Sequence, residues 1–297
     1  MRELLITGGQ AFILLLISPL IQGIIKKAKA RLQRRRGPKI IQPYHDIIKL
    51  MRREAVSSVN TSWITTVVPY IYFSAFLIAA SIIPVSGQKG LMLGDIIVFI
   101  YLFALARFFL ALAALESASA FGGMGSSREM MIASLVEPVF AIALFGMVAL
   151  SGSTDFNVVA GAGQNISGVL AFFGLMVVTV TETGRIPADN PDTHLELTMV
   201  HEGMLLEYSG RQLGLLHAAA WLKQTILLVL LVHLFLPAQE GSGLWVIYLS
   251  LFGKLTMLGL ILALIESLTV KMRLFRLPHL MASGAIFCLA SVLINNL

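Results

Sequence analysis

The chain has 297 residues, of which 57% are hydrophobic and 13% are charged, and its mean hydropathy is +0.84. An ordinary soluble domain carries roughly 25% charged residues, so this composition excludes a soluble globular protein. The formal net charge is +6, and a single cysteine, Cys288, excludes an internal disulfide or an iron–sulfur cluster held by this chain alone.

Eight apolar stretches are long enough to cross a membrane as helices, which takes about 20 residues each. They cover residues 4–25, 63–84, 96–115, 131–150, 166–182, 217–236, 244–266 and 278–294. We therefore predict an all-α polytopic membrane protein with about eight transmembrane helices, in which residues 1–297 form a single membrane domain.

Lys and Arg are distributed unevenly over the connections between these stretches. Eleven of them lie in residues 26–62, whereas the connections around Asp155 and Glu240 contain none. Such an excess marks the cytoplasmic side, and it explains the net charge without a nucleic-acid partner. The chain starts with Arg2 and Glu3 instead of a basic segment, so we expect the first stretch to be a retained helix. We predict a multi-pass protein of the prokaryotic cytoplasmic (inner) membrane with both termini on the outer side.

The first cytoplasmic connection, residues 26–62, contains two basic parts separated by a break. Residues 26–36 form a basic run that Gly37 and Pro38 interrupt, and residues 44–53 have the pattern of an amphipathic helix on the membrane face. Two interpretations remain open. The connection is either an orientation signal in contact with anionic lipids of the bilayer, or a docking platform for a soluble subunit.

The connection after the fifth stretch, residues 183–216, is unusually acidic for the cytoplasmic side. Together with the residue that precedes it, it holds Glu182, Asp189, Asp192, Glu196, Glu202 and Glu207. Pro187 and Pro191 keep its start non-helical, and residues 193–208 then have helical spacing. Crowded carboxylates raise one another's pKa, and His titrates near neutrality. We interpret this cluster as a region of proton entry or redox-linked coupling.

Two alternatives for the acidic connection stay open. The first is a metal site built on His194, His201 and Glu202, although no established ligand spacing such as H-E-x-x-H is present. The second is a solvated acidic loop without a specific role.

Charged residues also occur within or at the edge of the apolar stretches. They are Arg107, Glu137, Glu182, Lys223, Lys254 and Glu266. Each costs roughly 2.5–3.5 kcal/mol at the centre of a membrane helix, so we expect them to line an interior path for charge. The alternative is a set of static ion pairs that fix helix packing. Arg107 and Glu116 are nine residues apart and point in opposite directions on one helix, so their partners must come from other helices.

Three groups of residues give the chain a resemblance to a known family. They are Arg35, Arg36, Gly37 and Pro38 with Gln42 and the run from Asp46 to Leu50; the run from Glu182 to Asp189; and the run from Glu207 to Gly210. In these residues the chain resembles the subunit 1 family of respiratory complex I over nearly its whole length. Residues 93–109, 127–129 and 136–138 are most similar to the membrane subunits of group 4 energy-converting nickel–iron (NiFe) hydrogenases, formate hydrogenlyase among them.

This resemblance implies an eight-helix subunit that is non-catalytic alone and joins a soluble electron-transfer arm to ion translocation. The implied partners are hydrogenase-like large and small subunits, an iron–sulfur subunit and antiporter-like membrane subunits. The implied cofactors belong to these partners and are iron–sulfur clusters and, in a hydrogenase partner, a NiFe centre. We therefore expect no cofactor and no metal site in this chain.

The resemblance also assigns roles to residues. The proton path would contain Glu137, Glu182, Asp189, Asp192, His194, Glu196, Glu202 and Glu207. The intramembrane charge partners would be Arg107, Glu116, Lys223, Lys254 and Glu266. The docking face for soluble subunits would contain Arg35, Arg36, Gly37, Pro38, Asp46, Lys49 and Arg185.

The chain departs from the family pattern after Pro187. Ala188 stands where Phe is usual, Asn190 where Leu is usual, and His194 replaces the middle Glu of an acidic series. These changes argue against an ordinary quinone site. A related nickel-free or quinone-reducing ion pump remains an alternative, and so does a stand-alone secondary transporter, although the two halves of the chain show no inverted repeat.

Overall fold

The computed structural model describes residues 2–56, 62–85, 94–190, 199–237 and 243–296, with side chains from residue 7 to residue 295. All named elements in these ranges are helices. They are α1 (Arg2–Leu32), α2 (Gln42–Met51), α3 (Trp63–Ile82), α4 (Ile96–Glu116), α5 (Ala120–Ser151), α6 (Phe156–Val159), η1 (Ala162–Gln164), α7 (Ile166–Glu182), α8 (His201–Leu205), α9 (Gly210–Phe235), α10 (Leu244–Leu268), η2 (Leu274–Arg276) and α11 (Leu277–Asn296).

The membrane-spanning helices match the predicted apolar stretches. Among the described residues, seven helices are long and apolar enough to span a membrane. The pair formed by residues 156–164 and α7, which is bent by 107°, makes eight if it counts as one span. The prediction of an all-α polytopic membrane protein is thus confirmed.

Three helices are longer than the apolar stretches that predict them. α1 continues to Leu32, α5 begins at Ala120 and α9 begins at Gly210. The hydropathy pattern marks only the apolar layer, while the backbone hydrogen bonds of these helices continue beyond it. As a result Arg128, which the hydropathy pattern puts in a connection, lies within α5.

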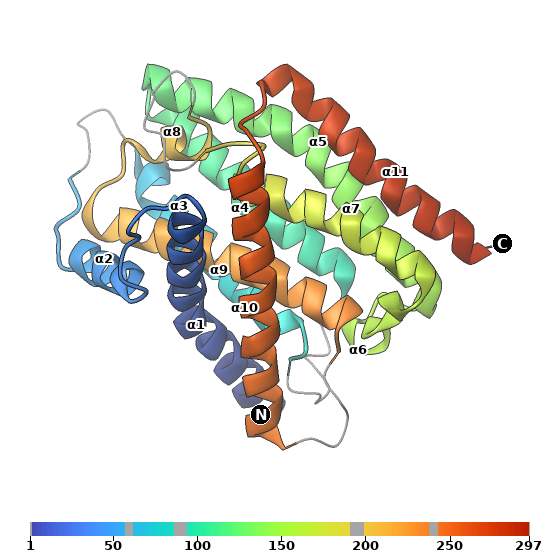
Figure 1. Ribbon diagram of the computed structural model, residues 1–297. Coiled ribbons are helices and arrows are strands. Elements are labelled where there is room, and N and C mark those ends of the chain that lie inside the picture. The colour runs from blue at the N-terminus through green and yellow to red at the C-terminus, as the bar shows by residue number, and fades with distance from the viewer. Residues whose placement is uncertain (1, 57–61, 86–93, 191–198, 238–242, 297) are drawn as a thin grey trace.

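α9 lies at the centre of the bundle and is the most buried of the spans (Figure 1). It contacts α3, α1, α10 and α7, while α11 packs against α7 and α5 at the periphery. An aromatic cluster fills the space between α3, α4, α5 and α6, with ring centroids 4.9–6.3 Å apart. Its members are Tyr72, Phe76, Phe99, Phe103, Phe140 and Phe156.

Polar side chains close the helix ends away from α2, where Figure 1 shows the chain ends and α6. Asp95 accepts a hydrogen bond from the Ile97 amide at 2.8 Å, and Asp155 accepts one from the Asn157 amide at 2.9 Å. Gln10 of α1 donates to the carbonyls of Ala80, in the last turn of α3, and of Ile83, just after it. These bonds satisfy backbone groups that helix ends leave unpaired.

α2 confirms the amphipathic helix predicted at residues 44–53. It packs against the start of α9 and against α1, at one end of the bundle that we call the α2 end. The chain leaving α2 is tied to the start of α9, because the Val56 amide donates to Ser209 Oγ at 2.7 Å. Gly210 is required there, since its φ is +51° and a Cβ would lie 2.2 Å from the Glu54 carbonyl oxygen.

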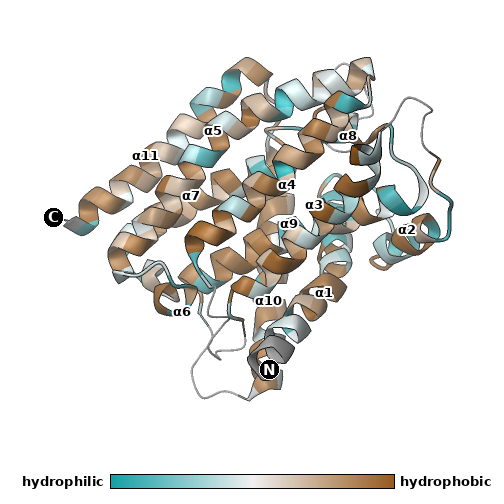
Figure 2. Ribbon diagram, turned by 180° about the vertical axis from the view of Figure 1, so that it is seen from behind, coloured by the Kyte–Doolittle hydropathy of each residue, from teal (hydrophilic) through white to brown (hydrophobic). Residues whose placement is uncertain are grey.

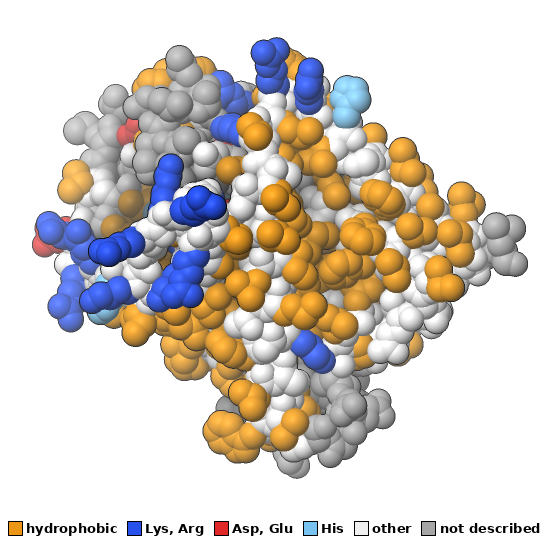
Figure 3. Space-filling model, viewed as in Figure 1, with side chains coloured by type: hydrophobic (Ala, Val, Ile, Leu, Met, Phe, Trp, Pro, Cys, Tyr) orange, Lys and Arg blue, Asp and Glu red, His pale blue; other side chains and the backbone are white. Residues whose placement is uncertain are grey.

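The spans consist mainly of hydrophobic residues (Figure 2), and many of their large apolar side chains are exposed, as expected for surfaces that face lipid. Lys and Arg side chains gather instead over the α2 end (Figure 3). In this view they cover the end of α1, α2 and the segment between α10 and α11.

A close contact between α7 and α11 makes their packing sensitive to one methyl group. A Cβ on Gly174 would lie 2.2 Å from Cys288 Sγ and 3.0 Å from the Gly284 carbonyl oxygen. We expect Gly174→Ala to lower the stability of the detergent-solubilised protein by about 1–3 kcal/mol, the usual cost of overpacking. Thermal unfolding measures this loss of stability. Gly253→Ala is the control, because a Cβ built on Gly253 would meet no atom within 4 Å. Equal melting temperatures for the two variants would contradict the described α7–α11 contact.

Candidate functional site

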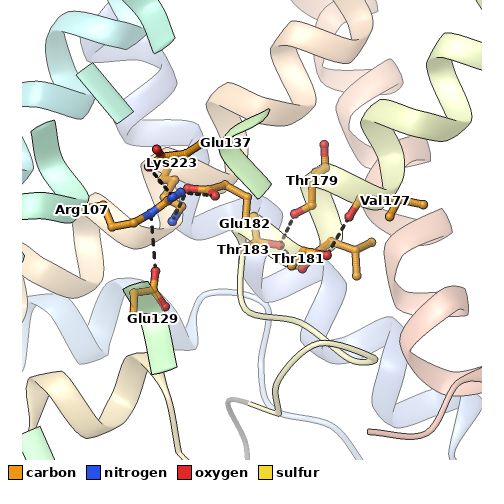
Figure 4. Close-up of polar contacts among 10 residues, drawn as sticks. Arg107, Glu129, Glu137, Val177, Thr179, Thr181, Glu182, Thr183 and Lys223 are labelled. Atoms are coloured by element: carbon orange, nitrogen blue, oxygen red, sulfur yellow. Dashed lines mark hydrogen bonds and ion pairs between the residues drawn. The ribbon is translucent and has the colours of Figure 1, made fainter. Parts of the chain in front are cut away.

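Arg107 of α4 lies buried at the centre of a group of carboxylates (Figure 4). Its Nη1 contacts Glu137 Oε1 of α5 at 2.8 Å, and its Nη2 contacts Glu182 Oε2 at the end of α7. Its Nε lies 3.8 Å from Glu129 Oε1, also of α5. A guanidinium offers five N–H donors in a planar fork, so it can hold several carboxylates at once.

Lys223 of α9 adds a second cation to this group. Its Nζ lies 3.0 Å from Glu182 Oε1, so Glu182 has a cationic partner on each oxygen. We call Arg107, Glu129, Glu137, Glu182 and Lys223 the ionic network. It joins four helices, in agreement with the expectation that the partners of Arg107 come from other helices.

Threonine hydroxyls shape the end of α7 that carries Glu182. The hydroxyl of Thr179 donates to the Leu175 carbonyl at 2.8 Å, and the hydroxyl of Thr183 donates to the Thr179 carbonyl at 2.7 Å. These bonds occupy carbonyls in the last turns of the helix. Gly184, with φ +60°, then turns the chain away, so that Glu182 is the last helical residue and faces Arg107.

A small cavity of about 40 Å³ lies beside the ionic network. Its lining includes Tyr72, Glu129, Glu182, Asp189, His201 and Lys223. A water molecule needs roughly 10–15 Å³ measured in this way, so the cavity has room for about three. The cavity therefore connects the ionic network with the 183–190 loop and with α8.

His201, the first residue of α8, is held neutral at this cavity. Its Nε2 is buried and has no hydrogen-bond partner among the described residues. Burial, together with the smaller effect of the nearby positive charge of Lys223, lowers the pKa of His201 from 6.5 to about 3. At physiological pH the ring is therefore uncharged.

A second cluster anchors the loop that follows α7. Arg185 is buried and pairs with Glu266 of α10, and it also donates to the side-chain oxygens of Gln22 and Gln224 at 2.6 Å. Lys29 of α1 contacts the other oxygen of Glu266 at 3.1 Å. The prediction that Arg185 belongs to the docking face is therefore wrong, because its guanidinium is used inside the bundle.

Asp189 lies at the other end of the same loop and is also buried. Its Oδ1 contacts Lys271 Nζ at 2.7 Å, and its Oδ2 accepts a hydrogen bond from the Val200 amide at 3.3 Å. The Met272 amide donates to the Pro187 carbonyl at 2.9 Å. The loop is thus fixed to the segment between α10 and α11.

Two predicted intramembrane charge partners have a different role. Glu116 accepts hydrogen bonds from the Ser62 amide at 2.9 Å and from the Thr65 hydroxyl at 2.8 Å, at the start of α3. Lys254 donates to the carbonyls of Leu236 and Pro237 at 2.8 and 3.0 Å, at the end of α9. In the described part of the chain both side chains bond to helix ends and form no ion pair, so the prediction is corrected for them.

The remaining residues of the predicted proton path fall into two groups. Glu202 and Glu207 are partly buried in and after α8, whereas Asp192, His194 and Glu196 lie outside the described residues. The helix predicted at residues 193–208 is described only as α8, residues 201–205. Of the predicted docking residues, Arg35, Arg36, Pro38 and Lys49 are exposed, and Gly37 and Asp46 are partly buried. Within the described ranges, no three His, Cys, Asp or Glu residues are arranged to hold a metal ion.

Sequence analysis did not select Glu129 as a site residue. The fourth apolar stretch begins only at residue 131, which puts Glu129 in a connection, whereas α5 begins at Ala120. Its position eight residues before Glu137, about two helical turns, was the available signal.

The comparison with known families gives the relationship directly. The family model described as NADH dehydrogenase matches residues 6–296. The chain belongs to the NADH dehydrogenase family. The predicted resemblance to the subunit 1 family of complex I is thereby confirmed.

Two curated relatives are similar to most of this chain. Formate hydrogenlyase subunit 4 of Escherichia coli (strain K12) is 35% identical over 288 residues, which cover 93% of this chain and 93% of that protein. Hydrogenase-4 component C of Escherichia coli (strain K12) is 38% identical over 246 residues, which cover 79% of this chain and 76% of that protein. The predicted similarity to membrane subunits of hydrogenase complexes is also confirmed.

A solved structure has the same fold. A chain of the membrane-bound sulfane sulfur reductase, an archaeal respiratory membrane complex, matches with a TM-score of 0.85 at 17% identity. The match covers 98% of this chain and 100% of that chain. At this identity the likeness concerns the fold alone.

The neutral state of His201 gives a prediction for stability against pH. The folded state binds the proton only near pH 3, whereas the unfolded state binds it near the ordinary value of 6.5. Stability contributed by the neutral ring is therefore present above pH 6.5 and is lost as the pH falls toward 3. We expect His201→Gln to flatten this part of the curve of melting temperature against pH. His45→Gln, on the exposed face of α2, is the control and should keep the wild-type slope; an unchanged slope for His201→Gln would contradict the neutral buried ring.

Proposed function

We propose that this chain is the membrane subunit of a complex I-like energy-converting hydrogenase complex. It anchors the soluble electron-transfer arm and couples redox chemistry to the translocation of protons or Na⁺, and it is non-catalytic alone. The ionic network around Arg107 carries the proposal. In a complex whose redox centres belong to partner subunits, this chain takes part in energy conversion by responding to changes of charge or position in those partners, and this network is a buried set of charges that respond to one another.

The proposed coupling is electrostatic. Electron transfer in the soluble arm changes the charge or the position of the 183–190 loop. The cavity connects this loop with Glu182. Because Arg107 contacts both Glu182 and Glu137, a change at one carboxylate alters the field at the other. A change of one pKa unit corresponds to about 1.4 kcal/mol, so a small displacement is enough to load or release a proton.

Glu137 marks the side of the subunit where the path continues. Its side chain is 44% exposed although it lies in the membrane-spanning helix α5. A carboxylate that faces lipid is costly, so this face needs a polar cover. We infer that an antiporter-like membrane subunit contacts α5 at Glu137 and receives the ion there.

The α2 end is the proposed docking face for the soluble subunits. Exposed basic residues extend from the end of α1 to α2, among them Arg35, Arg36 and Lys49 (Figure 3). The partners proposed to bind here are hydrogenase-like large and small subunits and an iron–sulfur subunit, which would carry the iron–sulfur clusters and a NiFe centre. This assignment orients the α2 end to the cytoplasm and both termini to the outer side of a prokaryotic inner membrane.

A quinone-reducing role is less well supported than the hydrogenase role. The cavity of about 40 Å³ suits water molecules, whereas ligand pockets usually measure several hundred Å³. Its lining includes the charged side chains of Glu129, Glu182, Asp189 and Lys223, which also favours a relay of protons over binding of an apolar ring.

Conservative variants of the network acids test the function. In the intact complex, we expect Glu137→Gln and Glu182→Gln to retain assembly and electron transfer at the active centre but to lose ion translocation by at least tenfold. The amide keeps the volume of the side chain and removes its titratable charge. Electron transfer with artificial acceptors and ion uptake into proteoliposomes measure the two activities separately.

The matched control for these variants is Asp155→Asn. Asn can still accept the hydrogen bond that the Asn157 amide donates at 2.9 Å, and the residue lies at the end away from α2. We expect wild-type ion translocation from this variant. Full translocation by the Glu137→Gln and Glu182→Gln complexes would exclude the proposed relay.

A further inference from the structure

The three carboxylates around Arg107 are not equally bonded. Glu137 contacts Nη1 at 2.8 Å, and Glu182 contacts both Nη2 and Lys223. Among the described residues, the single cationic contact of Glu129 is the one of 3.8 Å with Nε, which is beyond hydrogen-bond distance, and Nε itself is buried there without a hydrogen-bond partner. Glu129 is therefore the carboxylate that Arg107 stabilises least.

The charges of the network do not balance if all its acids are ionised. Arg107 and Lys223 supply two positive charges, and the three carboxylates would supply three negative ones. The next acid along the cavity, Asp189, has its own cation in Lys271, and His201 is neutral. The network is balanced when one carboxyl is protonated.

The position of Glu129 suits the exchange of protons with water molecules in the cavity. Its side chain is 15% exposed and lines the cavity together with Glu182, Asp189, His201, Tyr72 and Lys223. In Figure 4 it lies on one side of Arg107, with Glu137, Glu182 and Lys223 on the other. Glu129 thus lines the cavity without a hydrogen bond to Arg107 that the binding of a proton would have to break.

We propose that Glu129 is the proton-exchanging carboxyl of the ionic network, neutral in the resting protein while Glu137 and Glu182 stay ionised. This assignment rests on the proposed function and adds to it the group that is loaded first. In loading, an O–H bond of a hydronium ion in the cavity breaks, an O–H bond forms on Glu129, and water remains. No electron is transferred in this step, and the positive charge of the hydronium cancels the negative charge of Glu129.

Infrared spectroscopy of the purified complex tests the assignment, because a protonated carboxyl has a C=O band that a carboxylate lacks. Spectra of the wild-type complex in one redox state are compared with those of Glu129→Gln, Glu129→Asp and Asp155→Asn complexes, in H₂O and in D₂O. We expect Glu129→Gln to lose one deuterium-sensitive protonated-carboxyl band, Glu129→Asp to keep it with a shift, and Asp155→Asn, which lies outside the ionic network, to keep it unshifted. An unchanged band in the Glu129→Gln spectrum would overturn the proposal.

Thermal stability gives an independent readout. A neutral amide replaces a neutral acid in Glu129→Gln, so the melting temperature of this complex should equal that of the wild type, whereas Glu182→Gln should lower it. A fall in the melting temperature of Glu129→Gln as large as that of Glu182→Gln would also overturn the proposal. Both readouts are independent of ion translocation. A wild-type complex that shows this Glu129 band but translocates no ions would reject the proposed function and leave the protonation of Glu129 established.

Discussion

The buried guanidinium of Arg107 is the interaction on which the rest of the structure depends. A cation inside a membrane domain needs opposite charges close by. The carboxylates around Arg107 come from two other helices, α5 and α7. α4, α5 and α7 must therefore meet at this point, and Lys223 brings in the central helix α9. The same contacts determine the packing of the bundle and the placement of the ionisable groups.

The 183–190 loop follows the ionic network in the chain, and its own residues form two further ion pairs. Arg185 ties its start to Glu266 of α10, and Asp189 ties its end to Lys271. The cavity lies under this loop, so a shift of the loop changes the surroundings of Glu182 directly. The ionic network thus borders the cavity on one side and reaches the surface of the bundle at the half-exposed Glu137.

The sequence predicts the spans well, because the apolar length of a membrane helix is set by the thickness of the bilayer. It also singles out Arg107, Glu137, Glu182 and Lys223, because charge in an apolar stretch is costly. It does not tell which charges meet. Composition cannot distinguish Lys254, which bonds to carbonyls at a helix end, from Lys223, which pairs with a buried carboxylate.

Two errors share one physical cause. Glu129 was missed because hydropathy marks the apolar layer and not the helix, which begins eleven residues earlier than the predicted span. Arg185 was expected on a docking face because a basic residue in a connection is normally exposed, yet Gln22, Gln224 and Glu266 enclose it. In both cases tertiary contacts beyond the apolar layer decide the outcome, and one sequence contains no direct record of them.

The coupling ratio of an Arg107→Lys complex tests the central claim most directly. Lysine keeps the positive charge but lacks the planar fork that bonds Glu137 and Glu182 together. Ions translocated per electron pair are measured in proteoliposomes that contain the complete complex, with the wild type beside it. The account predicts that electron transfer continues while the ratio falls severalfold; an unchanged ratio would contradict the claim that Arg107 links the two carboxylates in ion coupling.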